Sequence, residues 1–396
     1  MRAALRRAGP TTKLFLHLEF YDIVRNYDSA TAILDMIGSR GHQFIRELTL
    51  DGNWLPSTFN QELISSLFSR LEGEWKSLLH FTFDALPPHA HHFDTALSSF
   101  LNSMISAAPV LQYINIPAEI LPWIERKLSK KHSLLHLDIA RSPLFDETFR
   151  FSTWPNIKSL KIRGYGSHIE NSTPLDLRAI DPAGSAHGDI FAFPLLTHGE
   201  FIGHTLEFHS NLRLGSLTDL VLSGVHVKAI ASHSVEMPLL RRLVVENTRG
   251  INCIIAPILE TLSIGQLCGP VDLAYYLSNL FSGDPHQLDP VHLDLRPIYR
   301  EDDLNIVDMT VPLASVYLLR RLERISIARL AVVRGADRWK YRMLQSVNTD
   351  DGKAMVMLPK WKVMDLGQNN VPDWLWDIII ARQVAGFPVQ LNLTEG

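Results

Sequence analysis

One short apolar pattern recurs along the chain and constrains its fold more than any other feature. The pattern is L-x-x-L-x-L, with Ile, Val, Phe or Met allowed at the apolar positions, and its regular copies begin at residues 45, 78, 111, 134, 157, 217, 240 and 259. A single copy is a weak signal, but eight copies at recurring steps indicate a structural repeat. The steps are 33, 33, 23, 23, 60, 23 and 19 residues, so the step of 60 conceals one unit that the pattern does not find.

Less regular copies extend the repeat toward both ends. KLFLHL, with Leu16 and Leu18, is a candidate first copy, and later copies occur at residues 291–295, 322–327, 361–366 and 389–393. Proline ends a preceding helix and fixes the turn into a strand. Five copies carry a proline two residues before their first apolar position, namely Pro109, Pro155, Pro238, Pro257 and Pro359.

Between the strand phrases the apolar spacing changes to that of an amphipathic helix. We expect helices within residues 58–75, 92–107, 118–130, 273–281, 336–347 and 373–384. Each unit then reads as strand, turn and helix, and it buries its apolar faces only when neighbouring units stack on it. The predicted fold class is an α/β leucine-rich-repeat solenoid, a horseshoe with an inner parallel sheet, outer helices and irregular repeats.

The expected organisation is an N-terminal capping strand and helix over residues 1–44, followed by the irregular solenoid over residues 45–396. An excursion from the repeat is expected at about residues 164–194. The asparagine that commonly follows the strand in such repeats, where it hydrogen-bonds the turn backbone, is present at Asn53 and Asn369.

Composition excludes several classes of function. The 396 residues are 46% hydrophobic and 20% charged, which excludes disorder as the dominant state. With 38 Lys and Arg against 42 Asp and Glu, the formal net charge of -4 gives no reason to expect nucleic acid or an acidic membrane as a partner. The apolar runs fall short of the roughly 20 residues that a membrane-spanning helix requires.

The two cysteines, Cys253 and Cys268, have neither disulfide-framework nor metal-site spacing, which is typical of a reduced intracellular protein in the cytoplasm or nucleus. Cys253 stands among isoleucines and is interpreted as an inert buried thiol.

Motifs of enzyme chemistry are missing from the sequence. It contains no G-x-x-x-x-G-K-[ST], G-x-G-x-x-G, G-x-S-x-G or H-E-x-x-H, so we expect no catalytic residue and no cofactor. The densest set of metal-binding side chains is His89, His91, His92 and Asp94, but neighbouring residues in a loop point in divergent directions, and we expect a solvated loop without metal. The Gly-, Ser- and Pro-rich residues 164–188 are the other place for a ligand. An enzyme that uses these two loops is the less favoured alternative.

One basic region lies near the C-terminal end. It is interpreted as a solvated face, with contact to an acidic partner as the alternative, because Glu323 and Asp337 offset it. Its members are Arg320, Arg321, Arg324, Arg329, Arg334, Arg338, Lys340 and Arg342.

Several phrases resemble a known family. APILETLSI at residues 256–264, MPLLRRLVV at 237–245 and a late helix ending in IIIAR at 378–382 resemble the leucine-rich-repeat regions of fungal F-box proteins. The opening LRRAGPTTKLFLHLEF, followed by a helix over residues 29–39 and then HQFIRELTL, resembles the segment after the F-box in that family. The resemblance implies the substrate-recognition half of a ubiquitin-ligase receptor.

The chain departs from that family at its start. The F-box, a helical module that begins near L-P-x-E and binds a Skp1-type adaptor, would be expected before residue 1. LPWIE at residues 121–125 mimics its opening, but it lies between two repeat strands and leads into Lys127, Lys130 and Lys131, so we interpret it as an inter-strand helix. Adaptor binding is therefore carried by no residue of this sequence, and an F-box-less paralogue or a truncated gene product is expected.

Alternation along the strands predicts where a partner binds. The second and third apolar residues of each copy point into the core, so the residues that flank the second one point out on the inner face. His80, His136 and His292 share one such position and are expected to be exposed. The candidate partner-binding residues are Thr49, Thr82, Tyr113, Asn115, Asp138, Lys161, Arg163, Arg242, Asp294 and Arg324.

This surface is polar and of mixed sign, which suits a protein or peptide, whereas a nucleic-acid groove shows stacked aromatic residues in a basic channel. The leading hypothesis is a non-catalytic module that binds a protein substrate or scaffold partner on the inner face. A purely structural scaffold is the alternative.

Overall fold

The computed structural model of the chain comprises two compact units. The first comprises Met1–Ser167 with Leu177–Leu196, and the second comprises His168–Asp176 with Thr197–Gly396. The structure describes residues 14–19, 31–32, 35, 44–51, 66, 68–71, 73–84, 94–140, 151–164, 175–180, 186–208, 212–229, 234–265, 288–296, 306–308, 321–327, 332–334, 358–367, 371 and 373–393.

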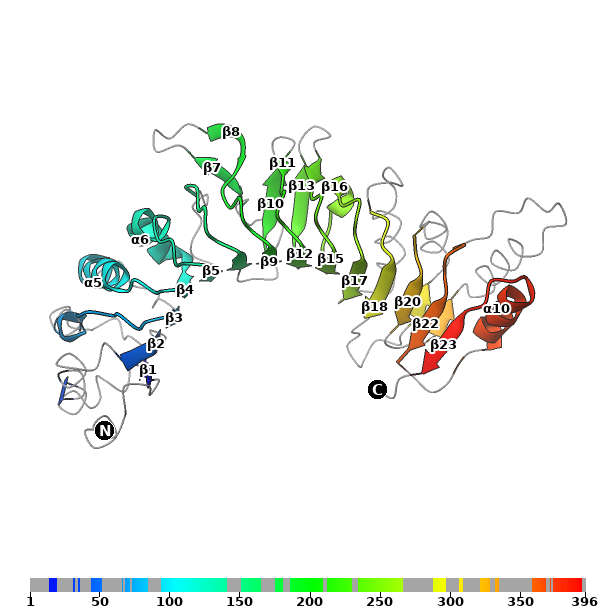
Figure 1. The fold of residues 1–396 in the computed structure, drawn as a ribbon, viewed down its shortest axis with the longest axis horizontal. Helices are drawn as coiled ribbons and strands as arrows, with labels where there is room; N and C mark the ends of the chain where they lie inside the picture. The colour runs from blue at the N-terminus through cyan, green and yellow to red at the C-terminus, as the bar shows by residue number, and fades with distance from the viewer. Residues whose placement is uncertain are drawn as a thin grey trace. The chain divides into compact units, whose positions relative to one another are not determined.

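The first unit is built on six parallel strands that pair in chain order (Figure 1). The strands are β1 (Leu14–Glu19), β2 (Ile45–Asp51), β3 (His80–Asp84), β4 (Tyr113–Pro117), β5 (His136–Ala140) and β6 (Ser159–Arg163). Each regular copy of the sequence pattern in this unit forms one strand, and KLFLHL contributes β1, as predicted.

The register of these strands places equivalent repeat positions side by side. Leu48 pairs with Phe81, Phe81 with Ile114, and Ile114 in turn with Leu137. Neighbouring strands lie about 4.8 Å apart, so each apolar position forms a continuous column across the sheet. These side chains are all buried, which confirms that the second and third positions of the pattern face the core.

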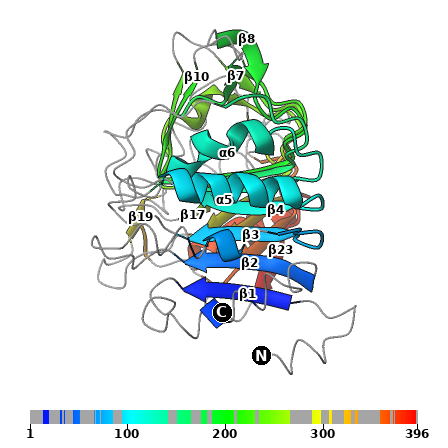
Figure 2. The same cartoon turned by 90° about the vertical axis from the view of Figure 1, so that its left-hand side faces the viewer.

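Two helices cover the apolar face of the first sheet. They are α5 (Asp94–Ala107) and α6 (Leu121–Leu128), which lie side by side in both views (Figures 1 and 2). Asn102 Nδ2 of α5 donates to the carbonyl oxygen of Trp123 at 3.3 Å. The helices predicted within 92–107 and 118–130 are thereby confirmed, and LPWIE opens α6 as an inter-strand helix.

Helical spacing of apolar residues accounts for both helices. The buried side chains of α5 recur at three- and four-residue intervals, and those of α6 follow the same rule. In α6, Pro122 stands in the first turn, where the missing amide hydrogen costs nothing. The buried residues are Leu97, Phe100, Leu101, Met104 and Ile105 in α5, and Leu121, Ile124 and Leu128 in α6.

The second unit carries its own run of parallel strands. The order is β9 (His198–Ile202), β12 (Asp219–Ser223), β15 (Arg242–Glu246), β17 (Thr261–Gly265), β18 (His292–Arg296), β20 (Arg324–Ile327), β22 (Val363–Leu366) and β23 (Gln390–Leu393). The less regular copies of the pattern after residue 290 are therefore strands too. Both units have the leucine-rich-repeat fold, an α/β arrangement of stacked parallel strands.

Strand β9 is the unit concealed in the step of 60 residues. Its phrase is L-x-x-G-x-F, with Leu196, Gly199 and Phe201 at the three positions. A Cβ atom at Gly199 would lie 3.2 Å from a ring carbon of Phe201 and 3.4 Å from Cδ1 of Leu220, so the larger Phe201 fills the space that a leucine occupies elsewhere. Pro194, two residues before Leu196, repeats the proline signature of the other copies.

Short strands, and not the helices of the expected repeat unit, connect the main strands between β9 and β17. One ladder joins β10 (Thr205–Phe208) to β13 (His226–Ala229), and a second joins β11 (Leu212–Arg213), β14 (Val235–Glu236) and β16 (Ile254–Ile255). The strand, turn and helix unit is therefore wrong in this stretch. The segments that connect the main strands here are short and rich in β-branched residues, which favour strand over helix.

Other elements complete the described chain. Helix α10 (Asp373–Val384) confirms the helix predicted over 373–384. Within the predicted excursion, β7 (Arg178–Ile180) and β8 (Ala186–Phe191) form an antiparallel pair, and β19 (Ile306–Asp308) pairs in parallel with β21 (Val332–Arg334). The helices predicted at 29–39, 58–75, 273–281 and 336–347 lie wholly or mostly outside the described residues.

Left-handed backbone follows three consecutive strands of the second unit. Gly203, Gly224 and Asn247 come directly after β9, β12 and β15, with φ of 67°, 58° and 42°. Thr248 Oγ1 donates to the carbonyl oxygen of Leu222 at 2.9 Å. Thr248 therefore supplies the turn hydrogen bond expected of the repeat asparagine, while Asn53 and Asn369 lie outside the described residues.

Among the described residues, no helix has both the length and the apolar character needed to cross a membrane.

We expect Gly250→Ala to destabilise the protein by about 2 kcal/mol, because a strained left-handed residue costs 1–3 kcal/mol. Gly250 has a φ of 76°, and a Cβ atom there would lie 1.9 Å from the carbonyl oxygen of Val227. Gly215→Ala is the matched control, since its Cβ atom meets nothing within 4 Å. Urea denaturation of both variants gives the comparison, and equal stability of the two would contradict the strain at Gly250.

Candidate functional site

In each unit, the face of the main strands opposite the apolar columns is polar and carries the candidate residues. In the first unit the register places Thr49, Thr82, Asn115, Asp138 and Lys161 in one column across β2 to β6. A second column is formed by the residues two positions earlier in each strand. It holds Glu47, His80, Tyr113, His136 and Ser159. A third column, two residues after the first in each strand, contains Asp51 and Asp84 and ends with Arg163 opposite Ala140. We call the surface formed by these three columns the first polar face.

Four of the predicted residues meet on the first polar face. Arg163 Nε donates to Asp138 Oδ1 at 3.1 Å and Arg163 Nη2 donates to Asp138 Oδ2 at 3.2 Å, so the guanidinium binds the carboxylate with two nitrogens. The same Nη2 donates to Asn115 Oδ1 at 3.2 Å. Tyr113 OH donates to Asp138 Oδ2 at 3.4 Å. Asp138 is therefore the common acceptor for side chains from β4 and β6.

Burial separates these residues into a lower and an upper layer. Asn115 and Asp138 are only 8% and 6% exposed, whereas the side chain of Arg163 is 37% exposed. Short side chains at the centre of the face are flanked by neighbouring strands on both sides, and the longer Tyr113 and Arg163 cover them. The lower layer therefore fixes the upper layer, and a partner would touch the upper one.

The electrostatics of this group follow from that burial. Burial raises the pKa of Tyr113 to about 12, and the nearby negative charge of Asp138 adds to the effect. Burial also raises the pKa of Asp138, while the guanidinium of Arg163 opposes the shift. Tyr113 consequently keeps its proton at neutral pH and remains a hydrogen-bond donor.

Histidine and glutamate extend the first polar face toward β2. His80 Nδ1 lies 3.2 Å from Glu47 Oε1, and the His80 ring meets the Tyr113 ring edge-on with centroids 5.7 Å apart. His80 and His136 are exposed, as predicted, and His292 of the second unit is half-buried. Thr49, Thr82 and Lys161 are half-buried as well.

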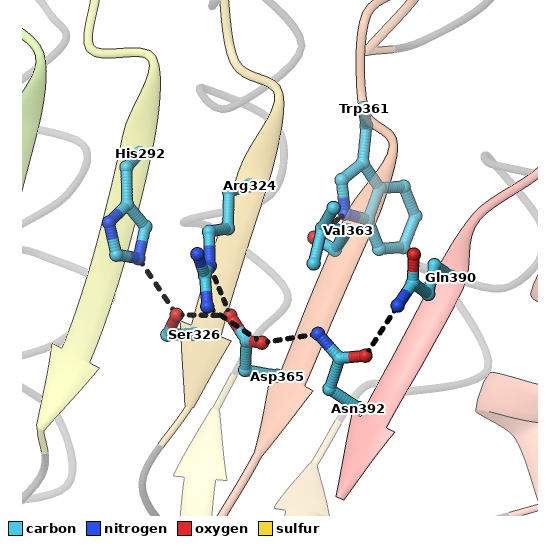
Figure 3. A network of polar contacts seen from close by, with 8 residues as sticks. All are labelled: His292, Arg324, Ser326, Trp361, Val363, Asp365, Gln390 and Asn392. Atoms are coloured by element: carbon cyan, nitrogen blue, oxygen red, sulfur yellow. Dashed lines mark hydrogen bonds and ion pairs between the residues drawn. The ribbon is translucent and has the colours of Figure 1, made fainter.

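The second unit has its own polar network on β18 to β23 (Figure 3). Arg324 Nε donates to Asp365 Oδ2 at 2.5 Å, and Arg324 Nη2 donates to Asp365 Oδ1 at 3.1 Å. Ser326 Oγ donates to Asp365 Oδ2 at 2.7 Å, and Asn392 Nδ2 donates to Asp365 Oδ1 at 2.9 Å. Asp365 of β22 therefore accepts hydrogen bonds from three side chains on the two flanking strands, β20 and β23.

Further contacts extend this network on both sides. His292 Nε2 lies 2.8 Å from Ser326 Oγ, and Gln390 Nε2 donates to Asn392 Oδ1 at 2.8 Å. Burial alone would raise the pKa of Asp365, but the hydrogen bonds from Arg324, Asn392 and Ser326 together lower it to about 2. Asp365 is thus a fixed anion whose charge is already compensated, which suits positioning of Arg324 rather than proton transfer.

The ten predicted residues thus divide between the two units. Seven belong to the first polar face, and Arg242, Asp294 and Arg324 belong to the second unit. Asp294 is buried and accepts a hydrogen bond from Ser263 Oγ at 3.1 Å, whereas Arg242 is exposed. The ten candidates include neither Asp365 nor Asn392, although both occupy the central position of their strand phrases, and that position was the available signal.

The other sites that the sequence offers lie mostly outside the described residues. Within the ranges that the structure describes, no group of three or more His, Cys, Asp or Glu side chains could hold a metal. The side chains of the His89–Asp94 cluster, most of residues 164–188 and most of the basic region after Arg324 lie outside those ranges. Burial raises the pKa of the Cys253 thiol to about 11, which fits the inert thiol expected there.

Comparison with known proteins adds little to this description. No family model matches the chain, and no curated protein matches it. Among solved structures, the chain is similar to one described as "Crystal structure of TLR13-ssRNA13 complex", with 14% sequence identity and a TM-score of 0.33. The alignment covers 87% of this chain and 55% of the other, so the chain spans about half the length of that protein. The fold assignment rests on the strand ladders themselves.

Asp365 predicts an acid-dependent loss of stability. Its pKa in the folded state is below the ordinary value of 3.8, so its contribution is present above about pH 4 and is lost as the pH falls through 2. At neutral pH we expect Asp365→Asn to lower the free energy of unfolding by about 2 kcal/mol.

Urea denaturation of the wild-type and variant proteins between pH 7 and pH 3 measures this difference, which should narrow below pH 4. In an Arg324→Gln background the effect of Asp365→Asn should be smaller, because two of the donors to the carboxylate are gone. If the difference in the free energy of unfolding is constant with pH, or is unchanged by Arg324→Gln, then ionised Asp365 does not stabilise the protein through Arg324.

Proposed function

We propose that the protein is a non-catalytic interaction module that binds a protein partner on the first polar face. The observation that carries the proposal is the fixed pair of Tyr113 and Arg163. Both side chains are half-exposed, and both are held from below by the buried Asp138, which Arg163 contacts with two nitrogens.

Fixed side chains of this kind favour protein binding for an energetic reason. Ordering a long side chain at an interface costs about 0.5–1.5 kcal/mol, and Arg163 is already ordered by Asp138 and Asn115. Tyrosine and arginine are also the residues that most often carry the binding energy of protein interfaces. The pair therefore has the composition and the rigidity of an interface centre.

The charges around this centre favour a protein over a nucleic acid. Lys161 and Arg163 are accompanied by Glu47 and Asp84 on the same polar face, so both signs are present within a few strands. A phosphate backbone is bound by an excess of positive charge. A folded partner with charges of both signs complements this surface better.

The wider surface and the organisation of the chain belong to the same proposal. On the second unit, Arg242 and Arg324 are exposed, and Arg324 is fixed on Asp365, so we propose them as candidate partner-binding residues of that unit. We also propose residues 1–44 as the N-terminal cap and residues 45–396 as the solenoid.

The resemblance to fungal F-box proteins supports a more specific form of the proposal. In that form the partner is a degradation substrate, and a Skp1-type adaptor joins only through an F-box supplied outside these residues. Affinity purification of the tagged protein with mass spectrometry identifies the partner. Skp1-type adaptors among the captured proteins would favour this form, whereas their absence would leave interaction without ligase recruitment.

We expect Tyr113→Ala combined with Arg163→Ala to reduce capture of that partner at least tenfold, since losses of 2 kcal/mol or more are usual for interface centres. Because removal of Arg163 leaves a buried carboxylate unpaired, the variant should also carry Asp138→Asn. Quantitative mass spectrometry of the captured partner measures the effect.

Lys76→Ala with Arg241→Ala is the matched control, since it removes two exposed cations that lie outside the first polar face. Thermal denaturation of each variant shows that it is folded. Unchanged capture by the folded Tyr113 and Arg163 variant would exclude the first polar face as the binding surface.

A further inference from the structure

A pocket of about 570 Å³ lies on the helical side of the first unit. It is formed where α5 and α6 end and where the chain turns toward β5. Ile105 and Pro109 contribute its apolar part, and Arg126, Lys127, Lys130 and Lys131 contribute four cationic side chains. None of these residues belongs to the first polar face, so the pocket is separate from the proposed protein-binding surface.

The positive charge in this pocket is not balanced by its lining. The lining residues include no aspartate or glutamate. Within the part of the chain that the structure describes, none of the four cations forms an ion pair. Elsewhere in the described chain, several exposed cations pair with carboxylates, as Arg241 does with Glu260 and Lys362 with Glu323.

Helix stabilisation explains only part of this charge. Cations in the last turn of a helix interact favourably with its dipole, and Arg126 and Lys127 stand in the last turn of α6. Lys127 Nζ also donates to the carbonyl oxygen of Asn102 and to Ser106 Oγ, both at 3.1 Å, so Lys127 links α6 to α5. Lys130 and Lys131 follow the helix, and their side-chain amino groups form no hydrogen bond with the described residues.

Two polar side chains that line the pocket are shielded from water, Lys131 in part and the Oγ atom of Ser133 fully. Lys131 is half-buried, and burial lowers the pKa of its ammonium group because the charge is partly removed from water. Ser133 Oγ is buried and has no hydrogen-bond partner among the described residues. A bound anion would offset the desolvation of Lys131 by attracting its ammonium charge, and the hydroxyl of Ser133, which also lines the pocket, could donate a hydrogen bond to it.

We propose that this pocket binds a small phosphate-bearing anion. Its volume lies within the range of about 300–1,000 Å³ that is usual for small-molecule sites. Four cations around one small space match the charge density of phosphate groups, each of which carries about -1.5 to -2 at neutral pH. An acidic peptide spreads its carboxylates along an extended chain and would need a longer basic groove than these residues form.

Isothermal titration of the full chain with sodium tripolyphosphate tests the site. We expect saturable binding with one ligand per chain in 150 mM NaCl. The variant Arg126→Gln, Lys130→Gln, Lys131→Gln should weaken this binding at least tenfold. Lys127 is left unchanged because it also joins the two helices.

The matched control is Arg213→Gln, Lys228→Gln, Lys360→Gln, which removes three exposed cations from the second unit and changes the net charge equally. This control should bind tripolyphosphate as the wild-type protein does. Thermal denaturation of both variants verifies folding, and the three single substitutions, each at an exposed or half-buried side chain, provide the comparison if the triple variant is unstable.

A second arm distinguishes the source of the phosphate. Phosphatidylcholine vesicles with 5% phosphatidylinositol 4-phosphate are incubated with the protein, with and without tripolyphosphate. Binding that tripolyphosphate displaces would identify a lipid headgroup, and no vesicle binding beside tripolyphosphate binding would identify a soluble ligand. Absence of saturable binding to both probes, or an equal loss in the control variant, would overturn the proposal.

Discussion

In-register stacking of parallel strands is the constraint on which the rest of the structure depends. Each copy of the sequence pattern places two apolar side chains on the same face of its strand, and the observed register sets these beside their equivalents on the next strand. Burying one such side chain contributes about 1.5–3 kcal/mol. A shift by one residue would turn every apolar side chain to the opposite face, so the register is strongly fixed, and the polar positions between the apolar ones are fixed with it.

This fixed spacing determines what the polar face can be. Short side chains in the central column are surrounded by neighbouring strands, so a carboxylate there needs donors from those strands. Asp138 obtains them from Tyr113 and Arg163, and Asp365 obtains them from Arg324, Ser326 and Asn392. In each unit a buried aspartate thereby holds a more exposed arginine, and this arrangement underlies the proposed function.

The sequence was informative where one repeat position has one physical role. The copies before residue 160 and after residue 215 form strands, and the helices that include Leu97 and Leu375 lie where apolar spacing predicted them. Strand β9 was not recognised, because Gly199 stands where leucine was required and only Phe201 compensates for the lost volume. The short strands that pair around Val227 and Val235 were not predicted, because strand pairing between connecting segments depends on neighbours that a single repeat does not contain.

The candidate site was predictable to a similar degree. Alternation along the strands placed Tyr113 and Arg163 on the polar face, but it could not show that Asp138 lies beneath them, since that depends on the lengths of side chains from three strands. The same limit applies to Asp365 and Asn392, which come from copies of the pattern that are 27 residues apart in sequence.

Hydrogen–deuterium exchange of the protein with and without its captured partner tests most directly whether the partner binds to the first polar face. Slower exchange in β3 to β6, with α5 and α6 unchanged, is the predicted result. Protection confined to α5 and α6, with β3 to β6 unaffected, would contradict it.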